Sequence, residues 1–122
     1  MATVLYVDDE DAIRRALKSW LTRRGHTVYA VGSSDEAREV LASHDVDALF
    51  IDIWLGEENG FDLFEWVDMN KPAIAQRTVF VTGDIIRDPD VERSIAAFER
   101  PILTKPFELA ELERIVLGWA KQ

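Results

Sequence analysis

The sequence predicts an α/β fold in which helices cover both faces of one parallel five-stranded sheet. Strand-like and helix-like segments alternate along the whole chain, and the strand-like segments are continuously apolar. Continuously apolar strands are typical of a parallel sheet that is buried on both faces. Polar residues also follow four of the strands directly, as they do where the edge of such a sheet carries chemistry.

The chain begins with two strands that flank a helix. Thr3–Val7 is almost entirely apolar, which predicts a buried strand. Residues 11–24 carry apolar side chains at helical spacing, which predicts an amphipathic helix. Gly25 follows at the position where a left-handed residue commonly ends a helix. Thr27–Val31 is predicted to be the second strand.

The residues at the start of the second helix predict where it begins. Ser33 and Glu36 have the spacing of a capping box, in which the two side chains satisfy free backbone amides at a helix start. This pattern predicts a helix that runs from Ser33 to about Ser43. Residues 48–53 are again apolar up to an acidic residue and are predicted to form the third strand.

The middle of the chain repeats the alternation. Residues 54–59 are predicted to be a loop, and a helix follows at Gly60–Asn70. Pro72 closes that helical region, because proline cannot continue a helix from inside it. Thr78–Thr82 is predicted to be the fourth strand.

The last third of the chain supplies two helices and one short strand. Asp88 and Pro89 have the pattern of an N-cap followed by a first-turn proline, which predicts a shorter helix ending near Phe98. Ile102–Thr104 is predicted to be the fifth strand. The final helix is marked by an apolar stripe at helical spacing. The stripe consists of Leu109, Leu112, Ile115, Val116 and Trp119.

These elements make up a (βα)5 pattern, and we expect residues 1–122 to form a single domain. Parallel neighbours require crossover helices, and such crossovers are right-handed. The doubly wound solution is the flavodoxin-like sandwich with strand order 2-1-3-4-5. Its switch point then lies between the first and third strands, so we expect a site at the carboxyl edge there.

Composition excludes several classes of protein. The chain has 23 acidic and 14 basic residues, a net charge of -9, which argues against a nucleic-acid surface and against binding to anionic membranes. It has no cysteine, so disulfide and thiolate chemistry are excluded. No apolar run approaches membrane-span length, and no signal-peptide pattern precedes the first strand. We therefore expect a cytoplasmic protein.

Three carboxylates are predicted to share the carboxyl edge of the sheet. Asp8 and Asp9 follow the first strand, and Asp52 lies at the end of the third. Carboxylate oxygens are ligands that Mg²⁺ prefers, so the trio predicts a magnesium site. A simpler interpretation is that Asp9, Glu10 and Asp11 are acids favoured at the start of a helix by its dipole.

The same edge collects a candidate nucleophile and two groups that could bind a phosphoryl group. A carboxylate such as Asp52 can attack phosphorus and form an aspartyl phosphate. The ammonium of Lys105 could pair with Asp52 or with a phosphoryl oxygen, although a lone lysine is more often a solvated surface residue. Thr82 ends a buried strand, so its hydroxyl must find a partner, which could also be a local backbone group.

Over essentially its whole length, the chain resembles the receiver domain of two-component response regulators. Four motifs in the right order carry the resemblance, although each alone is weak. They are Val7-Asp8-Asp9-Glu10, then Ile51-Asp52-Ile53-Trp54-Leu55 with Gly60 eight residues after Asp52, then Val81-Thr82-Gly83, and finally Leu103-Thr104-Lys105-Pro106-Phe107.

The resemblance implies a role for each site residue. Asp52 matches the phosphoacceptor, which takes a phosphoryl group from a phosphohistidine. Asp8 and Asp9 match the acidic pair that holds Mg²⁺ together with Asp52 and the backbone carbonyl of Trp54. Thr82 matches the switch hydroxyl that moves onto the phosphoryl group, and Lys105 matches the phosphoryl-binding lysine. The resemblance therefore implies that Asp52, Thr82 and Lys105 together form the reacting set.

The resemblance also implies partners. We expect a histidine kinase or a phosphotransfer domain as donor, a downstream protein target, and no nucleic acid or membrane. The family's usual output surface is formed by the fourth helix, the fifth strand and the fifth helix, and a phosphorylation-dependent dimer is compatible with it. Such a switch catalyses only its own phosphorylation and dephosphorylation. We therefore do not expect an enzyme that transforms a metabolite. The chain is either a stand-alone protein or the receiver of a longer one, such as a hybrid kinase.

Four departures from the family pattern matter, and one of them is Pro101, which stiffens the start of the fifth strand. Ile102 stands where the family often has an aromatic switch residue, so a receiver-like binding module that works without phosphorylation is the second hypothesis. Gly56 stands where the loop commonly has proline. Trp54 is bulky for its position, and we hypothesise that its indole shields the aspartyl phosphate from water. The alternatives are that the side chain points into solvent, packs in the protein or docks a partner, and packing or binding is the commoner role of a tryptophan. Asp84 could instead repel phosphoryl or orient water.

Overall fold

The computed structural model describes residues 1–83 and 89–120 of the chain. The predicted helix cap Asp88 and the acid Asp84 lie outside the described residues. The elements are β1 Thr3–Val7, α1 Asp11–Arg23, β2 Thr27–Val31, α2 Ser34–Ser43, β3 Ala48–Asp52, β4 Trp54–Leu55, β5 Glu58–Asn59, α3 Gly60–Asn70, α4 Pro72–Ala75, β6 Thr78–Thr82, α5 Pro89–Phe98, β7 Ile102–Thr104 and α6 Leu109–Trp119.

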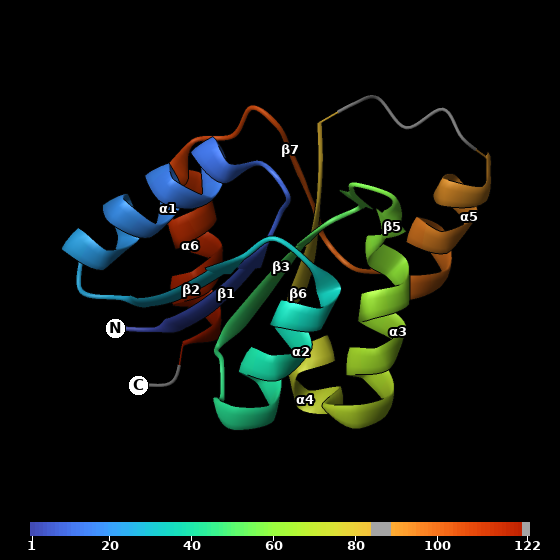
Figure 1. Ribbon diagram of the computed structural model, residues 1–122, viewed down its shortest axis with the longest axis horizontal. Helices are drawn as coiled ribbons and strands as arrows, with labels where there is room; N and C mark the ends of the chain where they lie inside the picture. Colours follow the sequence, from blue (N-terminus) through green and yellow to red (C-terminus); the bar gives the residue numbers. More distant parts are fainter. Residues whose placement is uncertain (84–88, 121–122) are drawn as a thin grey trace.

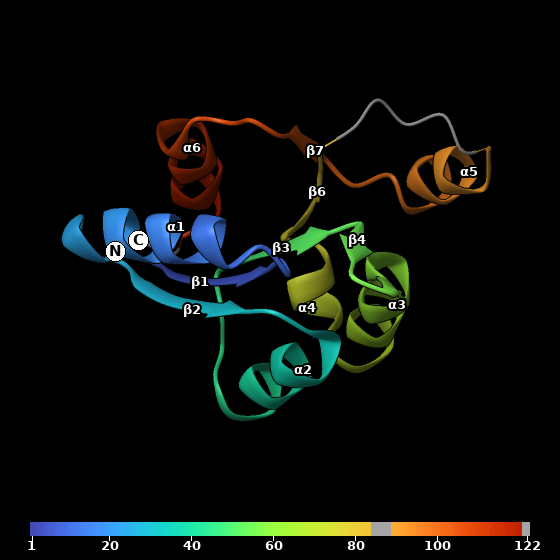
Figure 2. The same ribbon diagram turned by 45° about the horizontal axis from the view of Figure 1, so that its top comes forward.

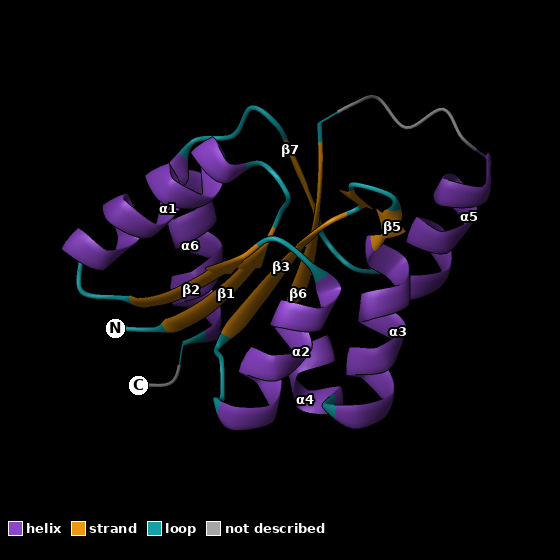
Figure 3. Ribbon diagram, in the orientation of Figure 1, coloured by secondary structure: helices purple, strands orange, loops and turns teal. Residues whose placement is uncertain are grey.

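A five-stranded parallel sheet forms the centre of the molecule, with strand order β2-β1-β3-β6-β7 (Figure 1). In terms of the predicted strands this is the order 2-1-3-4-5, so the expected flavodoxin-like α/β topology is confirmed. Helices α1 and α6 lie on one face, while α2, α3 and α4 lie on the other (Figures 2 and 3). No helix within the described part of the chain is long and apolar enough to cross a bilayer.

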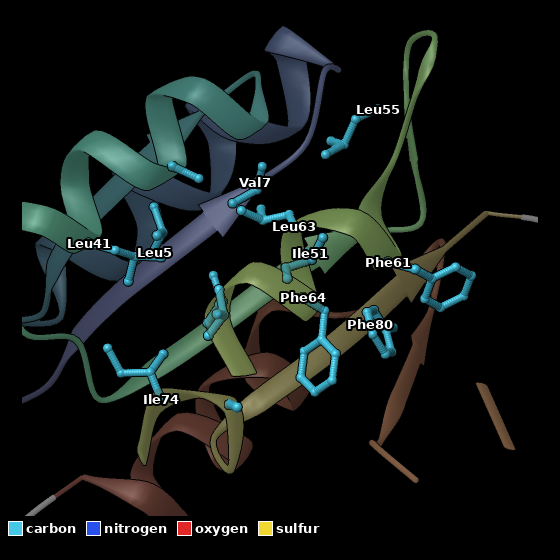
Figure 4. Close-up of a cluster of buried hydrophobic side chains, with 14 of the residues drawn as sticks. Leu5, Val7, Leu41, Ile51, Leu55, Phe61, Leu63, Phe64, Ile74 and Phe80 are labelled. Carbon is cyan, nitrogen blue, oxygen red and sulfur yellow. The ribbon is translucent and has the colours of Figure 1, made fainter. Parts of the chain in front are cut away.

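Each face of the sheet has its own apolar core, because successive side chains of a strand point to opposite faces. Leu5, Ile51 and Phe80 point toward the side of α2, α3 and α4 (Figure 4). Their neighbours in the strands, such as Val4 and Phe50, point toward α1 and α6. Burial of both faces explains why the strands are continuously apolar.

The predicted helix ends are largely confirmed. The Ser33 side chain accepts a hydrogen bond from the Glu36 amide at 3.2 Å, as the capping box requires. Helix α1 ends at Arg23, one residue before the predicted end, and Gly25 has a φ of +94°, the left-handed conformation expected of a helix-ending glycine.

Two short elements differ from the prediction for the middle of the chain. The predicted third strand ends one residue early, at Asp52, and the predicted loop 54–59 contains an antiparallel hairpin of β4 and β5. Gly56 lies at its turn with a φ of +61°, which glycine adopts without strain. Pro72 does not simply close α3 but begins the short helix α4, where proline suits the first turn.

A polar network ties the start of the chain to α6. Arg24 Nε lies 2.8 and 2.9 Å from the two carboxylate oxygens of the buried Glu113. The Ala2 amide donates to His26 Nδ1 at 3.1 Å, so the ring proton is on Nε2, which lies 2.8 Å from Glu113 Oε2. The hydrogen bonds from Arg24, more than that from His26, hold the pKa of Glu113 below its ordinary value.

Replacing Glu113 with glutamine should lower the free energy of unfolding at pH 7 by about 1–2 kcal/mol, because two charge-assisted hydrogen bonds are weakened. A carboxyl whose folded pKa lies below its unfolded value of about 4.5 stabilises the protein above that pH. This contribution is lost as the pH falls through the folded pKa, so the wild type and the variant should converge in acid.

Urea unfolding of both proteins across this pH range measures the effect. Glu65→Gln on the exposed side of α3 is the control and should change little at any pH. A gap between wild type and Glu113→Gln that stayed constant down to strong acid would show that the carboxylate charge contributes nothing.

Candidate functional site

The carboxyl ends of four neighbouring strands bring the predicted site residues to one edge of the sheet. Asp8 follows β1, Asp52 ends β3, Thr82 ends β6, and Lys105 follows β7. The strands are in parallel register, with Val7 opposite Ile51 and Thr82 opposite Thr104 in neighbouring strands. The shared edge expected from the sequence is therefore present in the structure.

Lys105 lies at the centre of the site. Its ammonium nitrogen is 2.7 Å from Asp52 Oδ2, 2.9 Å from Asp8 Oδ2 and 2.9 Å from Glu10 Oε1. Its side chain is only 11% exposed. Burial alone would lower the pKa of the ammonium, but hydrogen bonds to the three carboxylates outweigh it and raise the pKa above its ordinary value. Lys105 is therefore a permanently charged cation that compensates this acidic edge.

The Asp52 carboxylate is held from two sides. The Trp54 backbone amide donates to its Oδ1 at 2.9 Å, while Lys105 binds its Oδ2. Asp52 is 4% exposed, and this burial raises its pKa to about 6, although the bonds from Lys105 and the Trp54 amide act in the opposite direction. The geometry thus fixes a buried carboxylate at the carboxyl edge of the sheet.

Asp8 is fully buried and is held by donors that include a tyrosine. The Glu10 amide donates to Asp8 Oδ1 at 2.9 Å, and the Tyr6 hydroxyl donates to Asp8 Oδ2 at 2.7 Å. Burial, followed by the nearby Asp8 carboxylate, raises the pKa of Tyr6 well above its usual range, so its hydroxyl keeps its proton. Tyr6 therefore acts as a neutral donor beneath the acidic site.

The oxygen atoms of the site suit a hard divalent cation. Among the described residues, one carboxylate oxygen from each of Asp8, Glu10 and Asp52 lies within 4.8 Å of the others. Such a set of oxygen donors fits Mg²⁺, and a cation there would also offset the crowded negative charge. Asp9 is exposed and is not part of this set, and its Oδ2 lies close to Gly56.

Two residues of the site are not predicted by the sequence. The pattern predicts Glu10 only as a first-turn acid, but its side chain binds Lys105 across 95 positions of the chain. The pattern predicts Tyr6 only as part of an apolar strand. Its spacing of two from Asp8 was the available signal, because residues two apart in a strand share a face. The ligand roles of Asp9 and of the Trp54 carbonyl stay predictions.

Two further residues shape the edge. Thr82 is buried, and its backbone carbonyl accepts a hydrogen bond from the Lys105 amide at 2.7 Å. Ile102, the residue that replaces the expected aromatic, is half-buried and packs against the core beneath α3. The Trp54 indole is 46% exposed, so it is not a core residue. This exposure is compatible with a side chain that points into solvent, with docking of a partner and with shielding of the site.

Comparisons with known proteins agree with the fold and the motifs. A family model described as the response regulator receiver domain matches residues 4–117. The alginate biosynthesis transcriptional regulatory protein AlgB of Pseudomonas putida is 34% identical over 119 residues, which cover 98% of this chain and 25% of AlgB. The DNA-binding transcriptional regulator NtrC of Azospirillum brasilense is 31% identical over 115 residues, or 94% of this chain and 23% of NtrC. The chain thus spans about a quarter of the length of these relatives.

Solved structures of receiver domains have a similar fold. A response regulator receiver protein from Pseudomonas putida is 26% identical, with a TM-score of 0.82 and 96% of each chain covered. A CheY-like response regulator receiver domain protein from Methanospirillum hungatei JF-1 has a TM-score of 0.83, with 97% of this chain and 92% of that chain covered. Its identity is 20%, so this second likeness concerns the fold alone.

Proposed function

This chain belongs to the response regulator receiver domain family, and from that premise we propose that it is a phosphorylation-dependent switch with Asp52 as its phosphoacceptor. The observation that carries the proposal is the placement of Asp52, a buried carboxylate with one oxygen on a backbone amide and the other on Lys105. Receiver domains are phosphoacceptor switches and not enzymes that transform a metabolite.

The proposed reaction moves one phosphoryl group. An oxygen of Asp52 forms a bond to phosphorus while the bond from phosphorus to the donor's histidine nitrogen breaks, and that nitrogen keeps the electron pair. Lys105 exchanges its contact with Asp52 for a phosphoryl oxygen, and the Thr82 hydroxyl donates to another. A Mg²⁺ ion at this edge would offset charge on the phosphoryl oxygens. We propose Asp8, Asp9, Asp52 and the Trp54 carbonyl as its ligands, with Glu10 close enough to assist.

We propose a histidine kinase or a phosphotransfer domain as the donor. A mostly apolar groove of about 580 Å³ borders Lys105 between α1 and the segment after β7 and offers a docking surface beside the acceptor. Its lining includes Ile13, Pro106 and Phe107. The proposed output surface consists of α5, β7 and α6, with a downstream protein or a second phosphorylated copy as partner. The relatives' names describe transcriptional regulators, one of them DNA-binding. For this acidic stretch of chain, we propose protein partners.

The second candidate is a receiver-like binding module that works without phosphorylation. Ile102 favours it, because an aliphatic residue at this position cannot reproduce the ring rotation of an aromatic switch residue. The complete acidic site around Lys105 favours the phosphorylated switch.

Incubation with acetyl phosphate and Mg²⁺, followed by measurement of the intact mass, distinguishes the two candidates. We expect a single phosphoryl adduct on the wild type. It should be absent from Asp52→Asn, which keeps the side-chain size but removes the nucleophilic charge, and absent from the wild type without Mg²⁺. If neither acetyl phosphate nor a phosphohistidine donor labels the wild type, the binding module is the better account.

A further inference from the structure

We propose that Tyr6 is a positioning residue of this site and that its hydroxyl fixes the Asp8 carboxylate for cation binding. The inference rests on the proposed function and extends it to a residue beneath the acidic edge. Tyr6 is in β1, two residues before Asp8, so both side chains leave the strand on the same face. Its hydroxyl donates to Asp8 Oδ2 at 2.7 Å.

The Tyr6 ring cannot swing away from this position. It is fully buried, and it packs against Phe50 and Phe107 with ring centroids 6.4 Å away in each case. Packing alone would be satisfied by phenylalanine, which has the same ring. A buried hydroxyl without a partner is costly, and the Tyr6 hydroxyl is tolerated here because Asp8 Oδ2 accepts a hydrogen bond from it.

The Tyr6 hydroxyl is most important for orienting Asp8 when Lys105 has moved to a phosphoryl oxygen. In the structure, Asp8 Oδ2 contacts both the Tyr6 hydroxyl and the Lys105 ammonium. The proposed reaction draws Lys105 toward a phosphoryl oxygen. The Tyr6 hydroxyl and the Glu10 amide then stay as donors to Asp8, because both are fixed by the strand and the turn that carry Asp8 itself.

A neutral donor is the right kind of group for this task. Asp8 is fully buried, so bulk water is not present to orient its oxygens. The tyrosine adds no positive charge that would repel a divalent cation. It holds one lone pair of Oδ2 and so limits rotation of the carboxylate. Residues that orient metal ligands in this way typically contribute 10- to 100-fold to metal affinity.

The test compares Tyr6→Phe with Tyr29→Phe, which removes the chain's only other tyrosine hydroxyl. Tyr29 is half-buried in β2, packs against His44 and lies against the core on the other face of the sheet from Tyr6. Calorimetric titration with Mg²⁺ should give an affinity about 10-fold weaker for Tyr6→Phe and an unchanged affinity for Tyr29→Phe. Labelling of Tyr6→Phe by acetyl phosphate should recover to the wild-type rate when Mg²⁺ is raised to saturation.

Equal Mg²⁺ affinity of Tyr6→Phe and the wild type would overturn the inference and leave the proposed function standing. Absence of Mg²⁺ binding by the wild type itself would overturn both. If Tyr6→Phe does not fold, the Tyr29→Phe variant can be labelled with fluorotyrosine. Tyr6 is then the one remaining tyrosine, so the protein gives a single fluorine NMR signal from its ring. This signal should shift on addition of Mg²⁺, and a signal that does not move would overturn the inference.

Discussion

Replacing Lys105 with methionine is expected to lower the free energy of unfolding by about 3 kcal/mol or more. The substitution keeps an unbranched side chain but removes the cation that contacts Asp8, Glu10 and Asp52. Removing one partner of a buried ion pair is strongly destabilising, because the remaining charges are left uncompensated. Two of these carboxylates are almost inaccessible to water.

Urea unfolding near neutral pH measures the loss. Lys18→Met, at an exposed position of α1, is the matched control and should change stability little. Adding Asp52→Asn to Lys105→Met should recover part of the loss, since one uncompensated charge is removed. Mg²⁺ should also recover part of it. If Lys105→Met is as stable as Lys18→Met, the ammonium does not compensate the acidic edge.

Replacing Gly60 with alanine is expected to destabilise the protein by about 2–3 kcal/mol and to slow labelling of Asp52. A Cβ at this position would overlap the Asp52 backbone carbonyl oxygen and lie 2.8 Å from Ile51 Cγ2. Backbone atoms of a central strand cannot move aside as a flexible side chain can. The phosphoacceptor itself would therefore shift.

The control for Gly60→Ala is the same substitution at Gly118 near the end of α6. A Cβ there meets nothing within 4 Å, and alanine is the better helix former by up to about 1 kcal/mol. Gly118→Ala should therefore be neutral or stabilising, with normal labelling. Equal effects of the two substitutions on labelling would contradict the view that Gly60 leaves space for the acceptor strand.

The sequence predicts the sheet and the position of its active edge well, because the signals are local. Apolar runs specify the strands, and the capping box at Ser33 and the glycine at Gly25 specify helix ends. Parallel topology then brings the strand ends together without any further information. The pairing of Lys105 with Asp52, expected from the strand ends, is present at 2.7 Å.

Other features depend on contacts that no local pattern reports. Glu10 binds Lys105, which is far away in the sequence. From the sequence alone, an acid at this position is explained equally well by exposure to solvent or by the dipole of the helix that follows. Tyr6 looks like any aromatic residue of a buried strand until its hydroxyl is seen against Asp8. The hairpin of β4 and β5 and the short helix α4 are too short to leave a periodic signal.

Locating the phosphoryl group within the chain is the most direct test of the proposed role of Asp52. An aspartyl phosphate is reduced by borohydride to homoserine, so the labelled residue can be read from peptide masses after digestion. We predict homoserine at position 52 in the Mg²⁺-treated, phosphodonor-treated protein and an unmodified aspartate there without donor. Stable phosphorylation with no homoserine at position 52, or reduction at another aspartate, would contradict the assignment of Asp52 as the acceptor.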